Sequence, residues 1–142
     1  MVTDEDRALL GAALEVQERA HCPFSRYPVG SAVRTEEGEI FTGCNVESAS
    51  FSLTCCAERV AVFKAVSEGH KRIIACSIVT VEDKPAPPCG ACRQVLYEFG
   101  GNIRLILGNR RGDVRVLSLG DLLPEGFTAE QLSRSSEVVE SD

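Results

Sequence analysis

Two short stretches, TCCAERV at Thr54–Val60 and PPCGACRQV at Pro87–Val95, each place a cysteine where a predicted helix begins. Good helix formers follow both cysteines, and glycines end the two helical patterns at Gly69 and at Gly100. The segment between them, RIIACSIVTV at 72–81, is a nearly continuous apolar run, which is typical of a strand covered on both faces. A helix, a buried strand and a second helix therefore form the centre of the predicted fold.

The rest of the chain supplies a helix and further strands around this centre. A capping-box variant at Thr3 and Asp6 begins a helix that we expect to run from Asp4 to about Ala20. Four further strands are predicted, at 29–35, 39–45, 103–108 and 114–118, followed by short helical turns within 121–132. This order predicts an α/β fold of three layers, α/β/α, with a mixed five-stranded sheet and both cysteine helices on one side of it.

Length and composition indicate one domain. The chain has 142 residues, 44% of them hydrophobic and 25% charged, which is average for a globular protein of this size. We expect a single domain over 1–142, with a frayed polar tail at about 134–142. No apolar run approaches the roughly twenty residues that a membrane span needs, and the acidic start MVTDEDRALLGAALEV is unlike a secretory signal. The sequence therefore predicts a cytosolic protein with no membrane partner.

Cysteine content and net charge restrict the function. Seven cysteines are an odd number, and in the cytosol they are expected to be reduced, which favours metal binding or thiol chemistry over disulfides. The formal net charge of -6 argues against binding to nucleic acid, since that function needs clustered Lys and Arg. A small-molecule substrate fits this charge better.

Three cysteines have the spacing of metal ligands. Cys89 and Cys92 lie three residues apart at the start of one predicted helix, and Cys56 begins the other, where the positive helix end favours thiolate over thiol. Three protein ligands and a water are typical of a catalytic zinc, whereas a fourth Cys or His would close a structural site. Chelation by Cys55 beside Cys56 is strained, so the open site is favoured. The candidates for a fourth ligand are Cys55, Cys44, Cys76, His21 and His70.

Glu58 is the candidate catalytic residue. It lies two residues beyond Cys56, within reach of a zinc-bound water, from which it can take a proton and return it to a substrate nitrogen and a leaving amine. Three thiolates and one divalent cation sum to a net charge of about -1, and the guanidinium of Arg59 can offset it by hydrogen bonding to a sulfur. Arg93, beside Cys92, is a second candidate for that role. A solvated helix glutamate and surface arginines are the alternative interpretations.

These residues resemble the signature of the zinc-dependent cytidine and deoxycytidylate deaminase superfamily in its three-cysteine form, Cys56-Ala57-Glu58 followed by Pro88-Cys89-Gly90-Ala91-Cys92. The resemblance extends through PFSRYPVGSAV, GCNVESAS, CAERVAVFKAVSEG and DLLPEGF, and it is strongest to the small homotetrameric type. It implies a cytidine deaminase-like fold, one Zn²⁺ per chain on Cys56, Cys89 and Cys92, and conversion of cytidine and deoxycytidine to uridine, deoxyuridine and ammonia in pyrimidine salvage. In that reaction zinc-bound hydroxide attacks C4 while Glu58 shuttles the protons.

The resemblance also implies substrate-binding residues. Asn45 and Glu47 match a pair that hydrogen-bonds the ribose 3′-hydroxyl, and an amide and a carboxylate at alternate positions can share one hydroxyl. Tyr27 matches an aromatic residue that contacts the base, and Ala57 is a further substrate-binding position. Phe127 matches a residue that reaches into the site of a neighbouring subunit. A homotetramer with sites shared between subunits is therefore implied.

Departures from the family pattern leave the substrate preference open. Phe24, Tyr27, Ser31, Ser48 and Phe51 stand where Tyr, Phe, Ala, Asn and Tyr are common. Three other functions also remain open. The first is deamination of another substrate, such as blasticidin S or an RNA base. The second is a zinc-stabilised binding module closed by Cys55, and the third is a thiol redox protein using Cys89 and Cys92, which leaves Glu58 unexplained. The roles of Cys55 and Cys22 are not assigned by the sequence.

Overall fold

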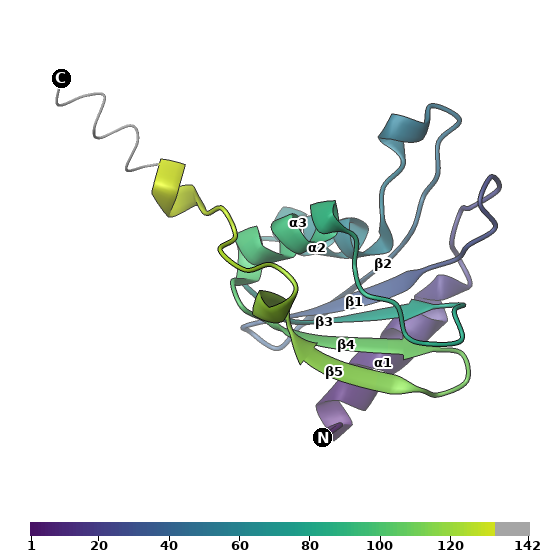
Figure 1. Ribbon diagram of the computed structural model, residues 1–142, viewed down its shortest axis with the longest axis horizontal. Coiled ribbons are helices and arrows are strands. Elements are labelled where there is room, and N and C mark those ends of the chain that lie inside the picture. The colour runs from purple at the N-terminus through teal and green to yellow at the C-terminus, as the bar shows by residue number, and fades with distance from the viewer. Residues whose placement is uncertain (133–142) are drawn as a thin grey trace, which may run out of the picture.

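The computed structural model describes residues 1–132 and has three layers, a five-stranded sheet with α1 on one face and α2 and α3 on the other (Figure 1). The elements are α1 (Asp4–Gln17), β1 (Gly30–Thr35), β2 (Ile40–Cys44), α2 (Ala57–Ser67), β3 (Ile73–Thr80), α3 (Gly90–Gly100), β4 (Arg104–Asn109) and β5 (Val114–Ser118). Short 3-10 helices lie at Phe51–Leu53 and Leu119–Asp121. The predicted order and the α/β/α layers are confirmed, while the tail predicted at 134–142 lies outside the described residues.

Strand pairing brings two loops to the same end of the sheet. The strand order is β2-β1-β3-β4-β5; β3 and β4 run parallel, and the other neighbours are antiparallel. A parallel pair needs a crossover connection, which α3 provides. Gly30 at the start of β1 pairs with Val79 near the end of β3, so the chain enters β1 where it leaves β3. The loop before β1 and the loop after β3 therefore lie side by side.

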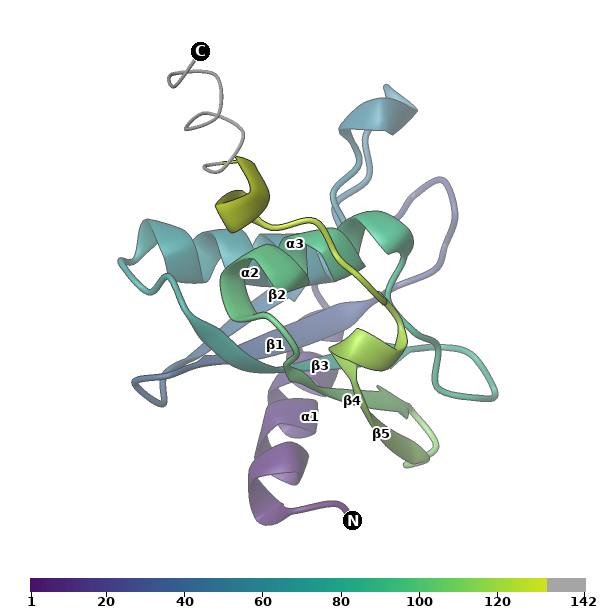
Figure 2. The same ribbon diagram turned by 60° about the vertical axis from the view of Figure 1, so that its left-hand side comes forward.

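The upper layer in Figures 1 and 2, α2 and α3, is held to the sheet by an apolar cluster. α2 packs on β2 and β1, and α3 packs on β3 and against α2. Buried members of the cluster include Val33, Val62, Ile73, Ile78, Leu96, Leu105 and Leu107. Burial of each such side chain contributes roughly 1.5–3 kcal/mol relative to exposure. This packing fixes the starts of both cysteine-bearing helices above the sheet.

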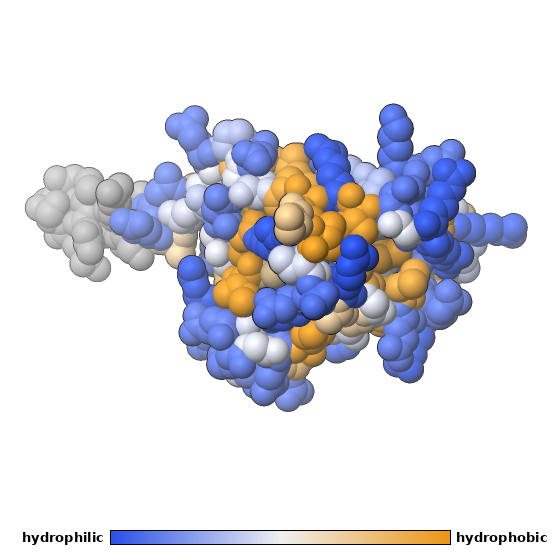
Figure 3. Space-filling view, turned by 90° about the horizontal axis from the view of Figure 1, so that it is seen from below, coloured by the Kyte–Doolittle hydropathy of each residue, from blue (hydrophilic) through white to orange (hydrophobic). Residues whose placement is uncertain are grey.

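α1 forms the lower layer of the described chain. Leu9 and Ala13 of α1 are buried against Ala32 of β1, Val79 of β3 and Ile106 of β4. Seen from below, apolar residues gather near the centre of this face and hydrophilic residues surround them (Figure 3). The central strands are therefore covered on both faces, as the apolar sequence of β3 predicts. None of the helices within residues 1–132 is long and apolar enough to cross a membrane.

α1 begins where the sequence predicts and ends earlier. The Thr3 hydroxyl accepts a hydrogen bond from Asp6 N at 3.1 Å, and the Asp6 carboxylate accepts one from Thr3 N at 2.9 Å, which completes the capping box. The helix ends at Gln17 rather than near Ala20, because the following N–H groups bond three residues back and tighten the last turn. The side chain of Gln17 is buried and donates to the Val79 carbonyl, which ties this end of α1 to β3.

Asp6 also joins the first turn of α1 to β4. Its carboxylate accepts hydrogen bonds from Arg104 Nε at 2.9 Å and Arg104 Nη2 at 2.7 Å, and its side chain is only 3% exposed. The hydrogen bond from Arg104 is the main reason why the pKa of Asp6 falls from 3.8 to about 2. The ion pair of Asp6 and Arg104 therefore stabilises the fold at every pH at which Asp6 is ionised.

We expect Asp6→Asn to lower the free energy of unfolding by about 1–2 kcal/mol at neutral pH. This value is reduced from the full effect of the pKa shift, because Arg104 is half-exposed and solvent screens the ion pair. Because the pKa of Asp6 is lower in the folded protein than in the unfolded chain, this contribution is complete above about pH 4 and is lost as the pH falls through about 2. Urea unfolding at neutral pH and near pH 2 measures it. Asp4→Asn, the same change at an exposed position of the same turn, is the control; an equal loss there would contradict the assignment.

Candidate active site

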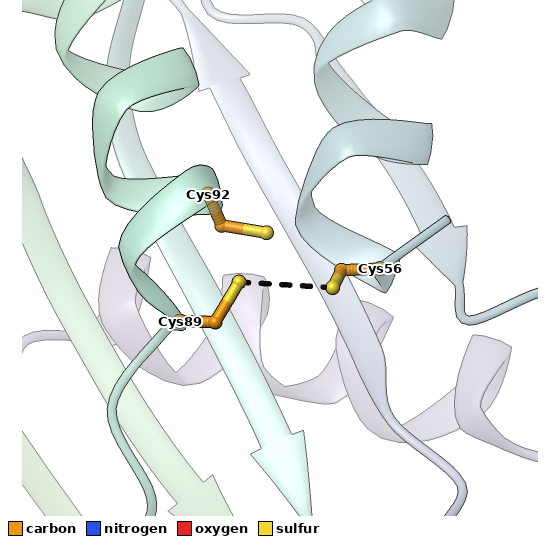
Figure 4. Close-up of side chains that lie close together, drawn as sticks. All are labelled: Cys56, Cys89 and Cys92. Carbon is orange, nitrogen blue, oxygen red and sulfur yellow. Dashed lines mark hydrogen bonds between the residues drawn. The ribbon is translucent and has the colours of Figure 1, made fainter. Parts of the chain in front are cut away.

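Three cysteine sulfurs meet between the starts of α2 and α3 (Figure 4). Cys56 is the N-cap of α2, Cys89 is the N-cap of α3, and Cys92 lies in the first turn of α3. Their Sγ atoms all lie within 4.8 Å of one another, and Cys56 Sγ lies 3.8 Å from Cys89 Sγ. A tetrahedral zinc with Zn–S bonds of about 2.3 Å separates its sulfurs by about 3.8 Å. The spacing of the three sulfurs therefore fits zinc.

Negative charge concentrates on one of these sulfurs. A hydrogen bond from Cys92 and the guanidinium of Arg59, whose Nη2 lies 3.5 Å from Cys56 Sγ, lower the pKa of Cys56 to about 5. The same hydrogen bond raises the pKa of Cys92, because its ionisation would break that bond and place a second charge beside the first. The thiolate in turn raises the pKa of Arg59. Metal uptake at such a site displaces the remaining thiol protons.

The other candidate ligands lie elsewhere. Cys55 belongs to a short backbone pairing with Val46, and burial raises the pKa of its thiol. Cys76 is fully buried in β3, where burial raises its pKa to about 12. His70 contacts carboxylates of the turn between β1 and β2 with both ring nitrogens. Within residues 1–132 the sulfur group has three members, so this part of the chain leaves one position of a tetrahedral centre open.

Glu58 lies in the first turn of α2, close to the sulfurs. Its side chain is 5% exposed and borders a cavity that Cys56 and Cys89 also line. Burial, assisted by the neighbouring Cys56 thiolate, raises the pKa of Glu58 from 4.5 to about 7. A carboxyl group in this range can both accept and donate a proton near neutral pH. Its burial contradicts the alternative interpretation of Glu58 as a solvated helix glutamate.

The cavity has a volume of about 520 Å³, which is within the range of small-molecule sites. The candidate residues that line it are Tyr27, Asn45, Glu47, Cys56, Ala57, Glu58 and Cys89. Its other lining residues, which the sequence analysis missed, are Ser25, Val29, Thr54, Ile78, Thr80, Ala86 and Pro87. Positions 78 and 80 alternate along β3. The two-residue period of that strand is therefore the signal that could have found Ile78 and Thr80.

Asn45 and Glu47 fix the segment that leads into β1. Asn45 Oδ1 accepts a hydrogen bond from Val29 N at 2.9 Å, and its Nδ2 donates to the Tyr27 carbonyl at 2.8 Å. Glu47 accepts hydrogen bonds from the hydroxyl and N–H of Ser25, which lower the pKa of its carboxyl. An amide or carboxylate has more donor or acceptor sites than these bonds use. Both residues can therefore bind a ligand while they hold this wall of the cavity in place.

Two residues considered in the sequence analysis lie apart from the sulfurs. Arg93 donates to the carbonyls of Pro88 and Leu122 at 2.8 and 3.0 Å, so these contacts do not support it as a second candidate for hydrogen bonding to a sulfur. Phe127 is 57% exposed, and its carbonyl accepts a hydrogen bond from Gln94. Its side chain is not part of the cavity wall of its own chain.

Comparison with known families now identifies this arrangement. The sequence model described as the cytidine and deoxycytidylate deaminase zinc-binding region matches residues 3–108, a span that contains the three sulfurs and Glu58. The chain belongs to the cytidine and deoxycytidylate deaminase family. The zinc expected from the sequence is thus confirmed as the cofactor of this domain, and Cys56, Cys89 and Cys92 are the residues that can hold it.

Named relatives span nearly the whole chain. The cytidine deaminase of Halalkalibacterium halodurans is 43% identical over 126 residues, which cover 88% of this chain and 96% of the relative. The cytidine deaminase of Mycobacterium tuberculosis is 42% identical over 126 residues, which cover 89% of this chain and 92% of the relative. The crystal structure of cytidine deaminase from Burkholderia pseudomallei matches with a TM-score of 0.82 at 46% identity, covering 85% of this chain and 98% of that one. The expected cytidine deaminase-like fold is confirmed, and the chain is an enzyme of this hydrolase family.

Gly43 of β2 sets how closely α2 of this deaminase approaches the sheet. A Cβ atom at Gly43 would lie 2.5 Å from the Ala57 carbonyl oxygen and 2.5 Å from Ala61 N, both in the backbone of α2. We expect Gly43→Ala to displace the start of α2, to lower the free energy of unfolding by about 1–3 kcal/mol and to reduce zinc binding at Cys56.

The control for this variant is Gly11→Ala in α1. Within residues 1–132, no atom outside the chain neighbours and the backbone of its own helix lies within 4 Å of a Cβ at Gly11. The same added methyl group should therefore stabilise the helix by about 0.5–1 kcal/mol and leave one zinc per chain. Denaturant unfolding and zinc content, measured on both variants, test the difference. Full zinc content together with unchanged stability in Gly43→Ala would contradict the importance of the close approach.

Proposed function

We propose that this protein hydrolyses cytidine and deoxycytidine to uridine and deoxyuridine with release of ammonia, as one domain spanning 1–142 and as part of pyrimidine salvage in the cytosol. The observation that carries the proposal is the buried carboxyl of Glu58, which lies beside three sulfurs that fit zinc and lines a nucleoside-sized cavity. The relatives named cytidine deaminase, at 42–43% identity over most of the chain, support the same substrate class.

The reaction needs one water and several proton transfers. Zinc, when bound, supplies the Lewis acidity that makes a water molecule nucleophilic near neutral pH. Glu58 would take one proton from that water and give it to N3 as C4 is attacked. It would then take the second proton, from the new hydroxyl on C4, and give it to the amino group, so that the C4–N bond breaks, the C4 carbonyl forms and ammonia leaves. The N–H of Ala57, at the first position of α2, has no acceptor within the helix and can donate to the pyrimidine carbonyl oxygen. One residue thus moves every proton while the helix start orients the base.

Two polar side chains of the cavity wall suit the sugar. Asn45 and Glu47 both line the cavity, and we assign to them the ribose 3′-hydroxyl, with the amide and the carboxylate sharing its donor and acceptor capacity. Tyr27, which lines the same cavity, is assigned to the base. A free 3′-hydroxyl distinguishes a nucleoside from a residue within an RNA strand.

The alternative functions have less support. The net charge of -6 disfavours an RNA substrate, because phosphate contacts need clustered positive charge. Blasticidin S has no 3′-hydroxyl for the pair Asn45 and Glu47. A closed zinc module needs Cys55 among the ligands, and its sulfur is outside the three-member group found in residues 1–132. A redox protein using Cys89 and Cys92 gives Glu58 no role.

We expect Glu58→Gln to keep the fold and one zinc per chain but to lower kcat for cytidine by about three orders of magnitude or more, because the amide cannot accept the proton. The loss of cytidine absorbance in the ultraviolet measures turnover, and metal analysis of the same sample measures zinc. Cys55→Ser is the matched control and should retain both zinc and turnover. Near-normal turnover in Glu58→Gln would refute the proton-shuttle role, and loss of zinc in Cys55→Ser would favour the binding module.

The proposed assembly is a homotetramer in which each site receives a residue from a neighbouring subunit. Phe127 supports it, because a large aromatic side chain that is 57% exposed has apolar surface to bury against another copy. Exposed Phe24 and Phe51, which line a hollow that shares Ser25, Glu47 and Thr54 with the cavity, have the same property.

Mixing two variants tests this sharing. Glu58→Gln lacks the proton shuttle of its own site, and Phe127→Ala lacks the aromatic ring that it gives to a neighbour. We expect each variant to be a tetramer by gel filtration with light scattering, and both to have low activity. Subunit exchange should then restore activity, because some mixed sites receive Glu58 from one chain and Phe127 from the other. A fully active monomer, or no recovery after proven exchange, would contradict shared sites.

A further inference from the structure

Ser25, in the segment before β1, lines the cavity together with Glu47 and has no role in the proposed reaction. Its hydroxyl donates to Glu47 Oε2, and its Oγ accepts a hydrogen bond from Tyr27 N at 3.1 Å. Its own N–H donates to Glu47 Oε1 at 3.1 Å, and the N–H of Phe24 donates to the same oxygen at 3.0 Å. One serine thus contacts a residue assigned to the sugar and a residue assigned to the base.

These bonds define what the Glu47 carboxylate can still bind. The hydrogen bond from the Ser25 side chain is the main reason why the pKa of Glu47 is lowered, so the carboxyl is ionised at neutral pH and only accepts. Each carboxylate oxygen accepts about two hydrogen bonds. Within residues 1–132, Oε1 accepts two N–H donors, whereas Oε2 accepts the Ser25 hydroxyl. One position on Oε2 is therefore left for a ligand that donates.

The turn that carries Ser25 depends on the same hydroxyl. Arg26 has a φ of 56°, in the left-handed region that residues other than glycine rarely adopt. Its N–H donates to the Cys22 carbonyl at 2.9 Å, and the bond from Tyr27 N to Ser25 Oγ closes over it. A conformation of this kind persists where the surrounding bonds hold it. The Ser25 hydroxyl therefore holds both the turn and the carboxylate.

We propose that Ser25 is a positioning residue that acts through Glu47, because its hydroxyl orients the carboxylate so that Oε2 accepts a hydrogen bond from the 3′-hydroxyl of the nucleoside. The inference rests on the proposed function and names the residue on which its sugar contact depends. Asn45 Nδ2 gives one N–H to the Tyr27 carbonyl, and its second N–H can donate to the same 3′-oxygen. A nucleoside with hydrogen at C3′ leaves both groups without this partner.

The test compares kcat/KM for deoxycytidine and 2′,3′-dideoxycytidine, which differ only in the 3′-hydroxyl. The ratio of the first to the second measures the 3′ contact, because the base and its chemistry are the same in both. Ser25→Ala should lower this ratio by about threefold to tenfold, part of the value of a hydrogen bond to a charged group. Ser25→Thr keeps the hydroxyl and should retain the ratio. If dideoxycytidine turnover is too slow to measure, the inhibition constants of deoxyuridine and 2′,3′-dideoxyuridine give the same ratio.

A control serine separates loss of this hydroxyl from loss of any other. The Ser67 hydroxyl donates to the Lys64 carbonyl at 2.8 Å at the end of α2, away from the cavity. Ser67→Ala should leave the ratio unchanged. A general loosening of the fold would lower kcat/KM for both nucleosides equally and would not change the ratio.

A double variant shows whether Ser25 acts through Glu47. Glu47→Ala should lower the ratio by itself, and adding Ser25→Ala should lower it no further, because the hydroxyl then has no carboxylate to orient. An unchanged ratio in Ser25→Ala overturns the proposal, and so do additive falls in the double variant or an equal fall in Ser25→Thr. Thermal unfolding and zinc content identify any variant that fails to fold. If the wild type does not turn over deoxycytidine, the proposed function itself fails; turnover with an unchanged ratio in Ser25→Ala refutes only this inference.

Discussion

The proximity of three cysteine sulfurs, all within 4.8 Å of one another, is the constraint on which the rest of the structure depends. Thiolates at this spacing repel one another strongly unless positive charge lies beside them. α2 and α3 direct their N-termini at the sulfurs, Arg59 adds a guanidinium, and zinc supplies the remaining charge. Both helices must therefore start at the same place. The parallel pairing of β3 with β4, which requires α3 as a crossover, and the close approach of α2 over Gly43 achieve this.

The same convergence determines the environment of Glu58. Because Cys56 is the N-cap of α2, Glu58 falls in the first turn, where α2 packs against β1 and β2. The carboxyl is buried there and close to the Cys56 thiolate, and both effects oppose its ionisation. No further residue is needed to raise its pKa. The Cys56 ligand and the proposed proton-transfer group, Glu58, are thus consequences of a single helix start.

Most of the fold could be predicted from the sequence, because α2 and α3 end at glycines and the central strands show clear apolar runs. The end of α1 could not, since its last turn depends on the contact between Gln17 and β3, which only the tertiary structure supplies. Cys56, Cys89 and Glu58 were recognisable because the chemistry fixes their spacing. The direction of the Arg93 side chain could not be predicted, because adjacency to a cysteine says nothing about where a long side chain points. Thr80 could not be identified as a cavity residue, because its position depends on how β3 pairs with β1, which the sequence does not show.

The proposed substrate binding and the integrity of the cavity wall are linked through Asn45 and Glu47. Both residues lie just beyond the end of β2 and hold the segment before β1. Asn45 bonds to the backbone of Tyr27 and Val29, and Glu47 bonds to Ser25. In the proposed site, a side chain assigned to the sugar therefore also sets the position of the residue assigned to the base. Loss of Asn45 would remove more than a contact with the sugar, because the backbone of Tyr27 and Val29 would lose its partners as well. Both proposed contacts thus depend on one hydrogen-bonded segment.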